Sequence, residues 1–191
     1  MPGNAFILLR TQKGVATGGE SMQSSHPASK GWLAITDWSW DIESETNFLK
    51  GTGASVGVAT PGTLSFSHNF DKSSPVIMQN IVLGTSFKSA VIHMLKSTGD
   101  ASGAPQVYFA MLMTDVFITK VSSKAGEDGA ISQDIECVFK TISIGYKQQL
   151  NNKGGALATA ITPFGWNIAA KSTTTGIAAV TLDPAKDITI P

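Results

Sequence analysis

The short run ITDWSWDIE (35–43) holds the carboxylates with the best spacing for acid–base chemistry. If the run is a strand, Asp37, Asp41 and Glu43 lie on one face, where two carboxylates could act as general acid and general base. A solvated sheet face requires the same pattern, because its polar side chains alternate with apolar ones. We interpret these carboxylates as a hydrated face and predict no catalytic residue.

The three histidines are the next candidates, either for a metal site or for a general base. His26 lies in the polar sequence SSHPAS, His68 on the apolar side of TLSFSHNF, and His93 in an expected strand. No His-x-His, HExxH or CxxC spacing occurs, and no G-x-S-x-G elbow or phosphate-binding loop is present. The sequence therefore predicts no enzyme, no metal and no cofactor.

The net charge, the cysteine content and the first residues argue against several other classes of protein, among them nucleic-acid-binding and membrane proteins. Fourteen basic and fourteen acidic residues cancel, and Arg10 is the only arginine, so a nucleic-acid partner is not expected. The single cysteine, Cys137, lies in the apolar run IECVF and is expected to be buried. The first residues, MPGNAFILLR, lack a basic segment and a long apolar run, so neither a signal peptide nor membrane insertion is predicted.

Runs rich in Val, Ile, Phe, Thr and Trp alternate with Gly and Ser clusters, which is typical of an all-β barrel or sandwich. One helix is expected in SPVIMQNIVLG, with Ser74 as N-cap, Pro75 at the first helical position and Gly84 at the end. The expected strands are Ala5–Arg10, Trp32–Ile42, Gly62–Phe70, Phe87–Lys96, Val107–Val121, Ile131–Gln148 and Phe164–Ala170.

Strict alternation along 32–42 predicts two faces. The face expected in the core holds Trp32, Ala34, Thr36, Trp38, Trp40 and Ile42. The opposite face, expected to meet water at its polar end, holds Leu33, Ile35, Asp37, Ser39, Asp41 and Glu43. Trp38, Trp40 and Trp166 are thus predicted core aromatics.

Several features go beyond a simple sheet. Strand Val107–Val121 is apolar on both faces and must be covered twice, by neighbouring subunits or by the helix. The apolar pattern after Ile131 changes parity, which predicts a bulge or bend near Lys140. Residues 43–62 are expected to form a long functional loop. The chain then divides into a barrel, 1–171, and a C-terminal extension, 172–191, with a short strand-like run at Ile177–Leu182.

The order of several short motifs resembles the haemolysin-coregulated protein (Hcp) family of bacterial type VI secretion systems. These motifs are FILL near the start, GES at Gly19–Ser21, WSW at Trp38–Trp40, LSFSHNFDKSSP before the helix, and PFGWNI at Pro163–Ile168. The resemblance covers about Ala5 to Lys171, and the tail beyond it exceeds the usual ending of the family.

The resemblance implies a compact, mainly β barrel with one short flanking helix, similar to phage tail-tube proteins. Hexameric rings of such subunits stack into the inner tube of a contractile machine, inside a sheath and behind a spike. Small effector proteins can travel in the lumen, so the subunit also acts as an effector chaperone. The protein would assemble in the bacterial cytoplasm and then be secreted by the machine without a signal peptide.

Applied to this chain, the resemblance suggests two functional surfaces. Asp37, Ser39 and Asp41 are expected to line the lumen and contact cargo, with Ser39 at the centre. Ring-to-ring contact is assigned to the loop residues Asn47, Phe48, Leu49 and Lys50. One alternative is the tail-tube subunit of a phage or other contractile particle. A second is a carbohydrate-binding β-sandwich, which predicts a monomer with exposed tryptophans.

Overall fold

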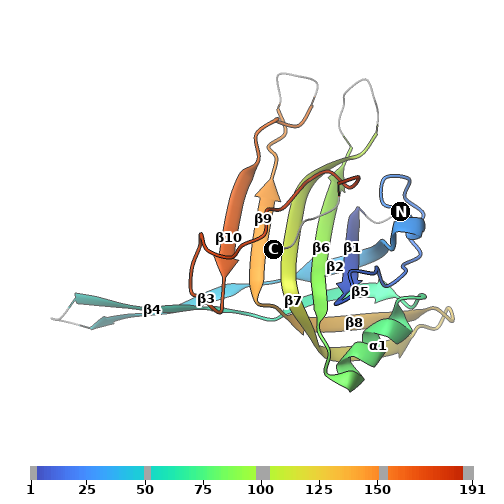
Figure 1. The fold of residues 1–191 in the computed structure, drawn as a ribbon, viewed down its shortest axis with the longest axis horizontal. Helices are drawn as coiled ribbons and strands as arrows, with labels where there is room; N and C mark the ends of the chain where they lie inside the picture. Colours follow the sequence, from blue (N-terminus) through green and yellow to red (C-terminus); the bar gives the residue numbers. More distant parts are fainter. Residues whose placement is uncertain (1–3, 50–52, 98–103, 151–154, 187–191) are drawn as a thin grey trace.

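Six strands of the computed structural model close into a barrel in the order β7-β6-β1-β2-β5-β8, and β8 returns to pair with β7 (Figure 1). The structure describes residues 4–49, 53–97, 104–150 and 155–186. The fold class expected from the sequence, a mainly β barrel with a short flanking helix, is confirmed. The elements are β1 Ala5–Thr11, η1 Ala28–Lys30, β2 Leu33–Ser39, β3 Ile42–Leu49, β4 Gly53–Pro61, β5 Leu64–Asn69, α1 Ser74–Leu83, β6 Phe87–Lys96, β7 Gln106–Ala125, β8 Ile131–Val138, β9 Thr141–Tyr146 and β10 Thr162–Asn167.

Strand β7 belongs both to the barrel and to a flanking sheet. Its first part pairs with β9, up to Thr114 opposite Thr141, and its second part pairs with β8, from Phe117 opposite Val138. Asp115 lies at this change of partner with a positive φ of 49°. The Lys140 ammonium lies 3.4 Å from its carboxylate. The predicted bend near Lys140 is therefore confirmed, and it divides the expected strand Ile131–Gln148 into β8 and β9.

The barrel interior is the main core. Alternate residues of every barrel strand point into it, and the largest fully buried ones are Ile7, Leu9, Leu33, Ile35, Leu64, Phe66, Phe87, Ile92, Met111 and Met113. Full burial of an aliphatic or aromatic side chain of this kind contributes roughly 1.5–3 kcal/mol. Cys137 is 1% exposed in this core, as expected.

A second apolar cluster covers the outer side of β1, β6 and β7. It contains Phe6, Leu8, Trp32, Val91, Leu95, Val107, Ala110 and Leu112, together with Ala178 and Leu182 from the C-terminal segment. The chain's own C-terminal residues therefore cover the outer face of β7 in this cluster. Helix α1 also contacts β7, as one of the two expected alternatives proposed. Ile177–Leu182 forms no strand, so that expectation is wrong, but its side chains pack on the barrel.

The two faces expected for 32–42 are wrong because β2 carries a bulge. Its pairing with β5 shifts register between Ile35 and Asp37, so side chains on the two sides of the shift exchange faces. Leu33 and Ile35 point into the barrel, and Trp38 and Trp40 then pack against the same core. Trp32 belongs to the second cluster on the outer side.

The region expected to be a long loop is a β-hairpin. Strands β3 and β4 pair with each other, from Ile42 opposite Pro61 to Leu49 opposite Gly53, and form a separate two-stranded sheet. Figure 1 shows this hairpin extending sideways from the barrel. Its alternation is weak in sequence because the run is rich in Ser, Thr, Gly and Ala, and pairing decides its structure.

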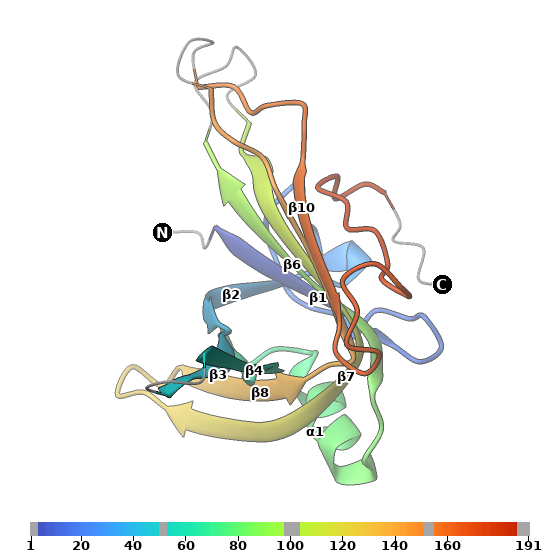
Figure 2. The same cartoon turned by 90° about the vertical axis from the view of Figure 1, so that its left-hand side faces the viewer.

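Helix α1 lies beside the barrel and contacts β7 (Figure 2). It begins one residue earlier than expected, with Ser73 as N-cap. Ile77 is fully buried against the core. The helix ends at Gly84, whose φ of 62° suits a residue without a β-carbon. Val82, near the end of the helix, is 83% exposed.

Candidate functional site

One exposed face of the barrel is polar across four strands, and we call it the polar face. In β5, Leu64, Phe66 and His68 point inward while Ser65 and Ser67 point outward. In β8, Ile135 and Cys137 point inward while Asp134 and Glu136 point outward. Because side chains alternate in strands, each strand supplies its apolar half to the core and its polar half to this surface.

The polar face is organised in two cross-strand rows. The first row runs Ser39–Ser65–Glu136–Lys120 through the registered pairs of β2, β5, β8 and β7. The Ser39 and Ser65 hydroxyls are 2.7 Å apart and hydrogen-bonded. The Lys120 ammonium donates to Glu136 Oε1 at 2.8 Å. Hydrogen bonding to Glu136, with the charge of that carboxylate, raises the pKa of Lys120.

The second row runs Asp37–Ser67–Asp134–Ser122 along the same four strands. The Ser67 hydroxyl donates to Asp134 Oδ1 at 2.7 Å. Lys124, opposite Ser132, adds a further charge beyond this row. The face thus combines hydroxyl groups with charges of both signs, and it is bordered by the exposed apolar pair of Phe117 and Val138.

Of the three residues predicted to line the lumen, two lie in the rows of the polar face and one lies outside them. Asp37 and Ser39 lie in the two rows, and both are contributed by β2. Asp41 lies between β2 and β3, where its backbone oxygen accepts from the Gly62 amide at 2.9 Å. Sequence reasoning missed the members from β5, β7 and β8, although their alternation is visible in LSFSHN and ISQDIECV.

The predicted core tryptophans all contact the barrel core. Trp166 is 9% exposed, and Trp38 and Trp40 are half-buried. Trp38 stacks on Phe109 with ring centroids 5.5 Å apart and donates to Met94 Sδ at 3.2 Å. The Trp40 indole N–H donates to the Gly62 carbonyl at 3.2 Å. A stacking platform for sugars requires open ring faces, and these rings are packed on protein.

The predicted ring-to-ring residues lie at the tip of the β3–β4 hairpin. Asn47, Phe48 and Leu49 are the last residues of β3 and pair with Ser55, Ala54 and Gly53. Lys50 lies outside the described residues. The hairpin is joined to the barrel at Ile42 and Pro61, which pair with each other.

Within the described part of the chain, no group of His, Cys, Asp and Glu side chains could hold a metal ion. No helix of that part is long and apolar enough to cross a membrane. His26 and His93 contact each other in the second cluster. The His68 side chain is buried on the inner side of β5, and its ring lies 4.0 Å from the Asp71 carboxylate.

The family model described as "Type VI secretion system effector, Hcp" matches residues 9–148. A solved structure described as a type six secretion system protein is 20% identical, with a TM-score of 0.76 over 89% of this chain and 98% of the other. Hcp1 from Salmonella typhimurium is 23% identical, with a TM-score of 0.64 and coverage of 89% and 99%. Hcp1 of E. coli EAEC 042 is 17% identical, with a TM-score of 0.66 over 84% of this chain and 97% of the other. Among curated proteins, none matches the chain.

Proposed function

Because the chain belongs to the Hcp family and is a tube subunit of a type VI secretion system, we propose that six copies form a ring whose bore is lined by the polar face. Such rings stack into the inner tube, with a sheath around it and a spike at its tip. Small effector proteins travel in the bore. The subunit assembles in the bacterial cytoplasm and leaves the cell with the tube.

The observation that supports this orientation is the hydration of the polar face. A bore filled with water and cargo favours a wall rich in polar side chains, and the Ser39–Ser65 and Ser67–Asp134 hydrogen bonds hold such side chains in place. The opposite outer side of the barrel carries the second apolar cluster under the C-terminal segment. We assign that side to the outside of the ring.

We assign ring-to-ring contact to the β3–β4 hairpin. It projects from the barrel (Figure 1) and pairs with no other strand of the described residues. A projecting element that fits into the next copy in the same orientation generates a head-to-tail interface, which propagates along an axis without closing.

Selective thiol labelling tests the position of the polar face. Ser39→Cys is assayed in assembled rings with a small maleimide and with a maleimide carrying a long polyethylene glycol chain. A thiol in the bore should react with the small reagent and much more slowly with the large one. Ser29→Cys is the matched control, because Ser29 is exposed in η1 and outside the polar face. The native thiol of Cys137 stays silent because it is buried.

Equal reaction of Ser39→Cys with both reagents in intact rings would place the polar face outside the bore. Light scattering supplies the independent check on the ring itself. Six copies of a 20.0 kDa chain have a mass of about 120 kDa, and a monomer at high concentration would contradict the ring. Neighbouring sheath and spike genes would distinguish a secretion tube from a phage tail tube.

Trimming the hairpin tests the ring-to-ring assignment. The register allows residues 47–55 to be replaced by Asn-Gly, which leaves Thr46 opposite Val56 as the last pair and supplies a tight two-residue turn. We expect electron microscopy to show rings of normal size that no longer form tubes. Tubes indistinguishable from those of the unmodified protein would refute the assignment.

The tube role requires no catalysis, and we propose that the protein is not an enzyme. The arrangement of the carboxylates agrees with this proposal. Glu136 is hydrogen-bonded to the Lys120 ammonium, and Asp134 accepts from a serine hydroxyl. These contacts occupy the carboxylates with partners on an exposed surface.

A further inference from the structure

The C-terminal segment Ser172–Lys186, which we call the strap, is fitted closely to the outer side of the barrel. Ala178 and Leu182 are 4% and 7% exposed. Two strands carry glycine where the strap crosses them. A β-carbon at Gly165 would lie 3.1 Å from Ile177 side-chain atoms, and one at Gly145 would lie 2.8 Å from Leu182 Cδ1. The strap is therefore a docked element with its own apolar anchors.

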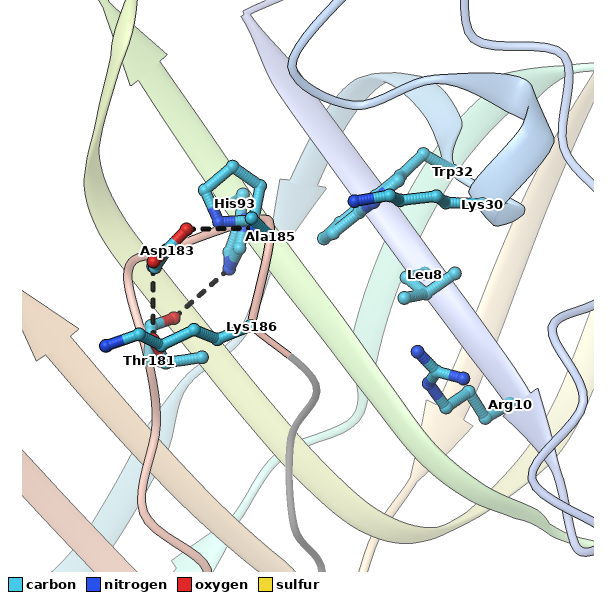
Figure 3. Close-up of a pocket in the computed structure, with 10 residues that line it drawn as sticks. Leu8, Arg10, Lys30, Trp32, His93, Thr181, Asp183, Ala185 and Lys186 are labelled. Carbon is cyan, nitrogen blue, oxygen red and sulfur yellow. Dashed lines mark hydrogen bonds between the residues drawn. The ribbon is translucent and has the colours of Figure 1, made fainter.

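A chain of hydrogen bonds joins the strap to the barrel, and Figure 3 shows His93 and Thr181 at its strap end. His93 Nε2 lies 3.3 Å from the Thr181 carbonyl of the strap. His93 Nδ1 lies 2.9 Å from His26 Nε2, and His26 Nδ1 lies 2.9 Å from the Ser25 hydroxyl. His26 and His93 are 0% and 1% exposed. We call Ser25, His26, His93 and the Thr181 carbonyl the histidine relay.

The direction of every bond in the relay follows from its last acceptor. A carbonyl oxygen can only accept, so His93 carries its hydrogen on Nε2. The other nitrogen of a neutral His93 then accepts from His26 Nε2–H, and His26 Nδ1 in turn accepts from the Ser25 hydroxyl. Two neutral rings thus satisfy every nitrogen without any charge.

Protonation disturbs this arrangement in two steps. One added proton can be placed only as a full positive charge on a buried pair of rings, beside the aromatic rings of Phe6 and Trp32. A second added proton would set two N–H groups against each other at the 2.9 Å His26–His93 contact. A neutral relay therefore favours the docked strap, because the first added proton costs burial of a charge and the second breaks the His26–His93 hydrogen bond.

We propose that the strap is a pH-dependent latch, which the neutral histidine relay holds on the barrel and which protonation of the relay releases. Release would uncover the outer face of β7 and β9, which Ala178 and Leu182 now cover. The latch lies in a single subunit, away from the polar face. It therefore stands independently of the proposed bore.

Burial opposes a positive charge on the relay, whereas the neighbouring charges act in both directions. Burial lowers the pKa of His93 to about 4, although the Thr181 carbonyl and Asp183 act in the opposite direction. Burial, with the charges of His93 and Lys30, lowers the pKa of His26 to about 3. The charged residues that line the two hollows beside the relay are Arg10, Lys30, Lys147, Asp183 and Lys186. Four of these five are cations.

The difference in the pKa of His93 between the docked and the released strap gives the direction and size of the pH effect on docking. A released strap lets water reach His93, and its pKa then rises toward the ordinary value of about 6.5. Since the docked form binds fewer protons, docking is complete above that pH and weakens as the pH falls from 6.5 toward 4. For His93 alone, the docking equilibrium constant falls by at most about 30-fold between pH 7.5 and pH 5.0.

Thiol exposure in the full chain measures strap release. Ala178→Cys places a thiol under the strap, and its reaction with dithiodipyridine is compared with that of a short unstructured thiol peptide at each pH. The relative rate should rise by up to about 30-fold from pH 7.5 to pH 5.0. Adding His93→Gln should leave less than a threefold rise, because the amide still donates to Thr181 but cannot be protonated. His68→Gln is the matched control, a buried histidine outside the relay, and should leave the full rise.

A second measurement decides the matter if His93→Gln fails to fold. Ala178→Asp puts a carboxylate among the buried anchors and should undock the strap in the full chain. Nuclear magnetic resonance titration should then show the pKa of His93 moving from about 4 toward 6.5. Three results would overturn the latch. The relative labelling rate of Ala178→Cys could be equal at both pH values, or it could rise fully in folded protein that also carries His93→Gln. The pKa of His93 could also be unchanged in Ala178→Asp.

Discussion

Gly19 is the position where a single added carbon should be most costly. A β-carbon there would lie 2.3 Å from the backbone oxygen of Trp32 and 2.5 Å from its carbonyl carbon. Ordinary contact begins at about 3.4 Å, so one of the two backbone segments must retreat by about 1 Å. Neither can do so freely, because both are main chain.

The retreat breaks identifiable hydrogen bonds. The Gly19 amide donates to the Gly31 carbonyl at 3.3 Å, and the Ser21 amide donates to the Trp32 carbonyl at 3.1 Å. Each is worth roughly 1 kcal/mol net, and overpacking of a tight site adds roughly 1–3 kcal/mol. We expect Gly19→Ala to lower the free energy of unfolding by about 3 kcal/mol, which corresponds to a fall in Tm of roughly 6–12 °C.

Urea unfolding of the full chain, followed by tryptophan fluorescence, measures this change. Gly126→Ala is the matched control, because the only close contact of its β-carbon would be the exposed side chain of Asp128, at 2.6 Å, with the Ala130 oxygen at an ordinary 3.6 Å. That side chain can turn away at the cost of one exposed hydrogen bond with the Ala130 amide, and the loss of backbone freedom in the unfolded chain offsets part of the cost. If the two variants differ by less than about 1 kcal/mol, the close approach at Gly19 is not what holds the loop against β2.

Two further predictions concern groups inside the barrel. Burial raises the pKa of Cys137 to about 12, so its thiol should resist labelling at pH 8 in folded protein and react fully in denaturant; rapid labelling of the native state would contradict the closed barrel. Burial also lowers the pKa of His26, His68 and His93, so the unfolded chain binds more protons below pH 6.5. As the pH is lowered below 6.5, the free energy of unfolding should therefore decrease by up to about 1.4 kcal/mol per pH unit for each histidine. A urea midpoint that is equal at pH 7 and pH 5 would contradict this.

The strands of the barrel were predictable because their signals are local. Alternation located β5 and β8, and the parity change after Ile131 predicted the bend that the structure shows at Lys140. Alternation failed in β2 because a bulge exchanges the faces between Ile35 and Asp37, and no residue type in that run announces it. Polar β3 and β4 were expected to be a loop for a similar reason, since only their mutual pairing makes them strands.

The candidate sites were less predictable because they depend on distant pairing. Asp37 and Ser39 were assigned to a polar face from one strand, but the rows that complete it come from β5, β7 and β8. The histidines were interpreted singly, as loop and strand residues. His26 and His93 are 67 positions apart, and their hydrogen bond exists only because the loop before β2 folds back over β6. Spacing in sequence carries no signal of such a contact.

The place of β1 between β2 and β6 determines when the barrel can close during synthesis. Leu8 lies opposite Val91, and Phe66 lies opposite Ile135. Both strand pairings can therefore form only after much of the chain has been synthesised. Pairings this distant in sequence make folding slow, because the ordering of a long intervening segment precedes the gain from contact. Until β8 is made, the first strands have unsatisfied edges that other nascent copies could pair with. The cell must therefore keep translating chains apart until each has closed its own barrel.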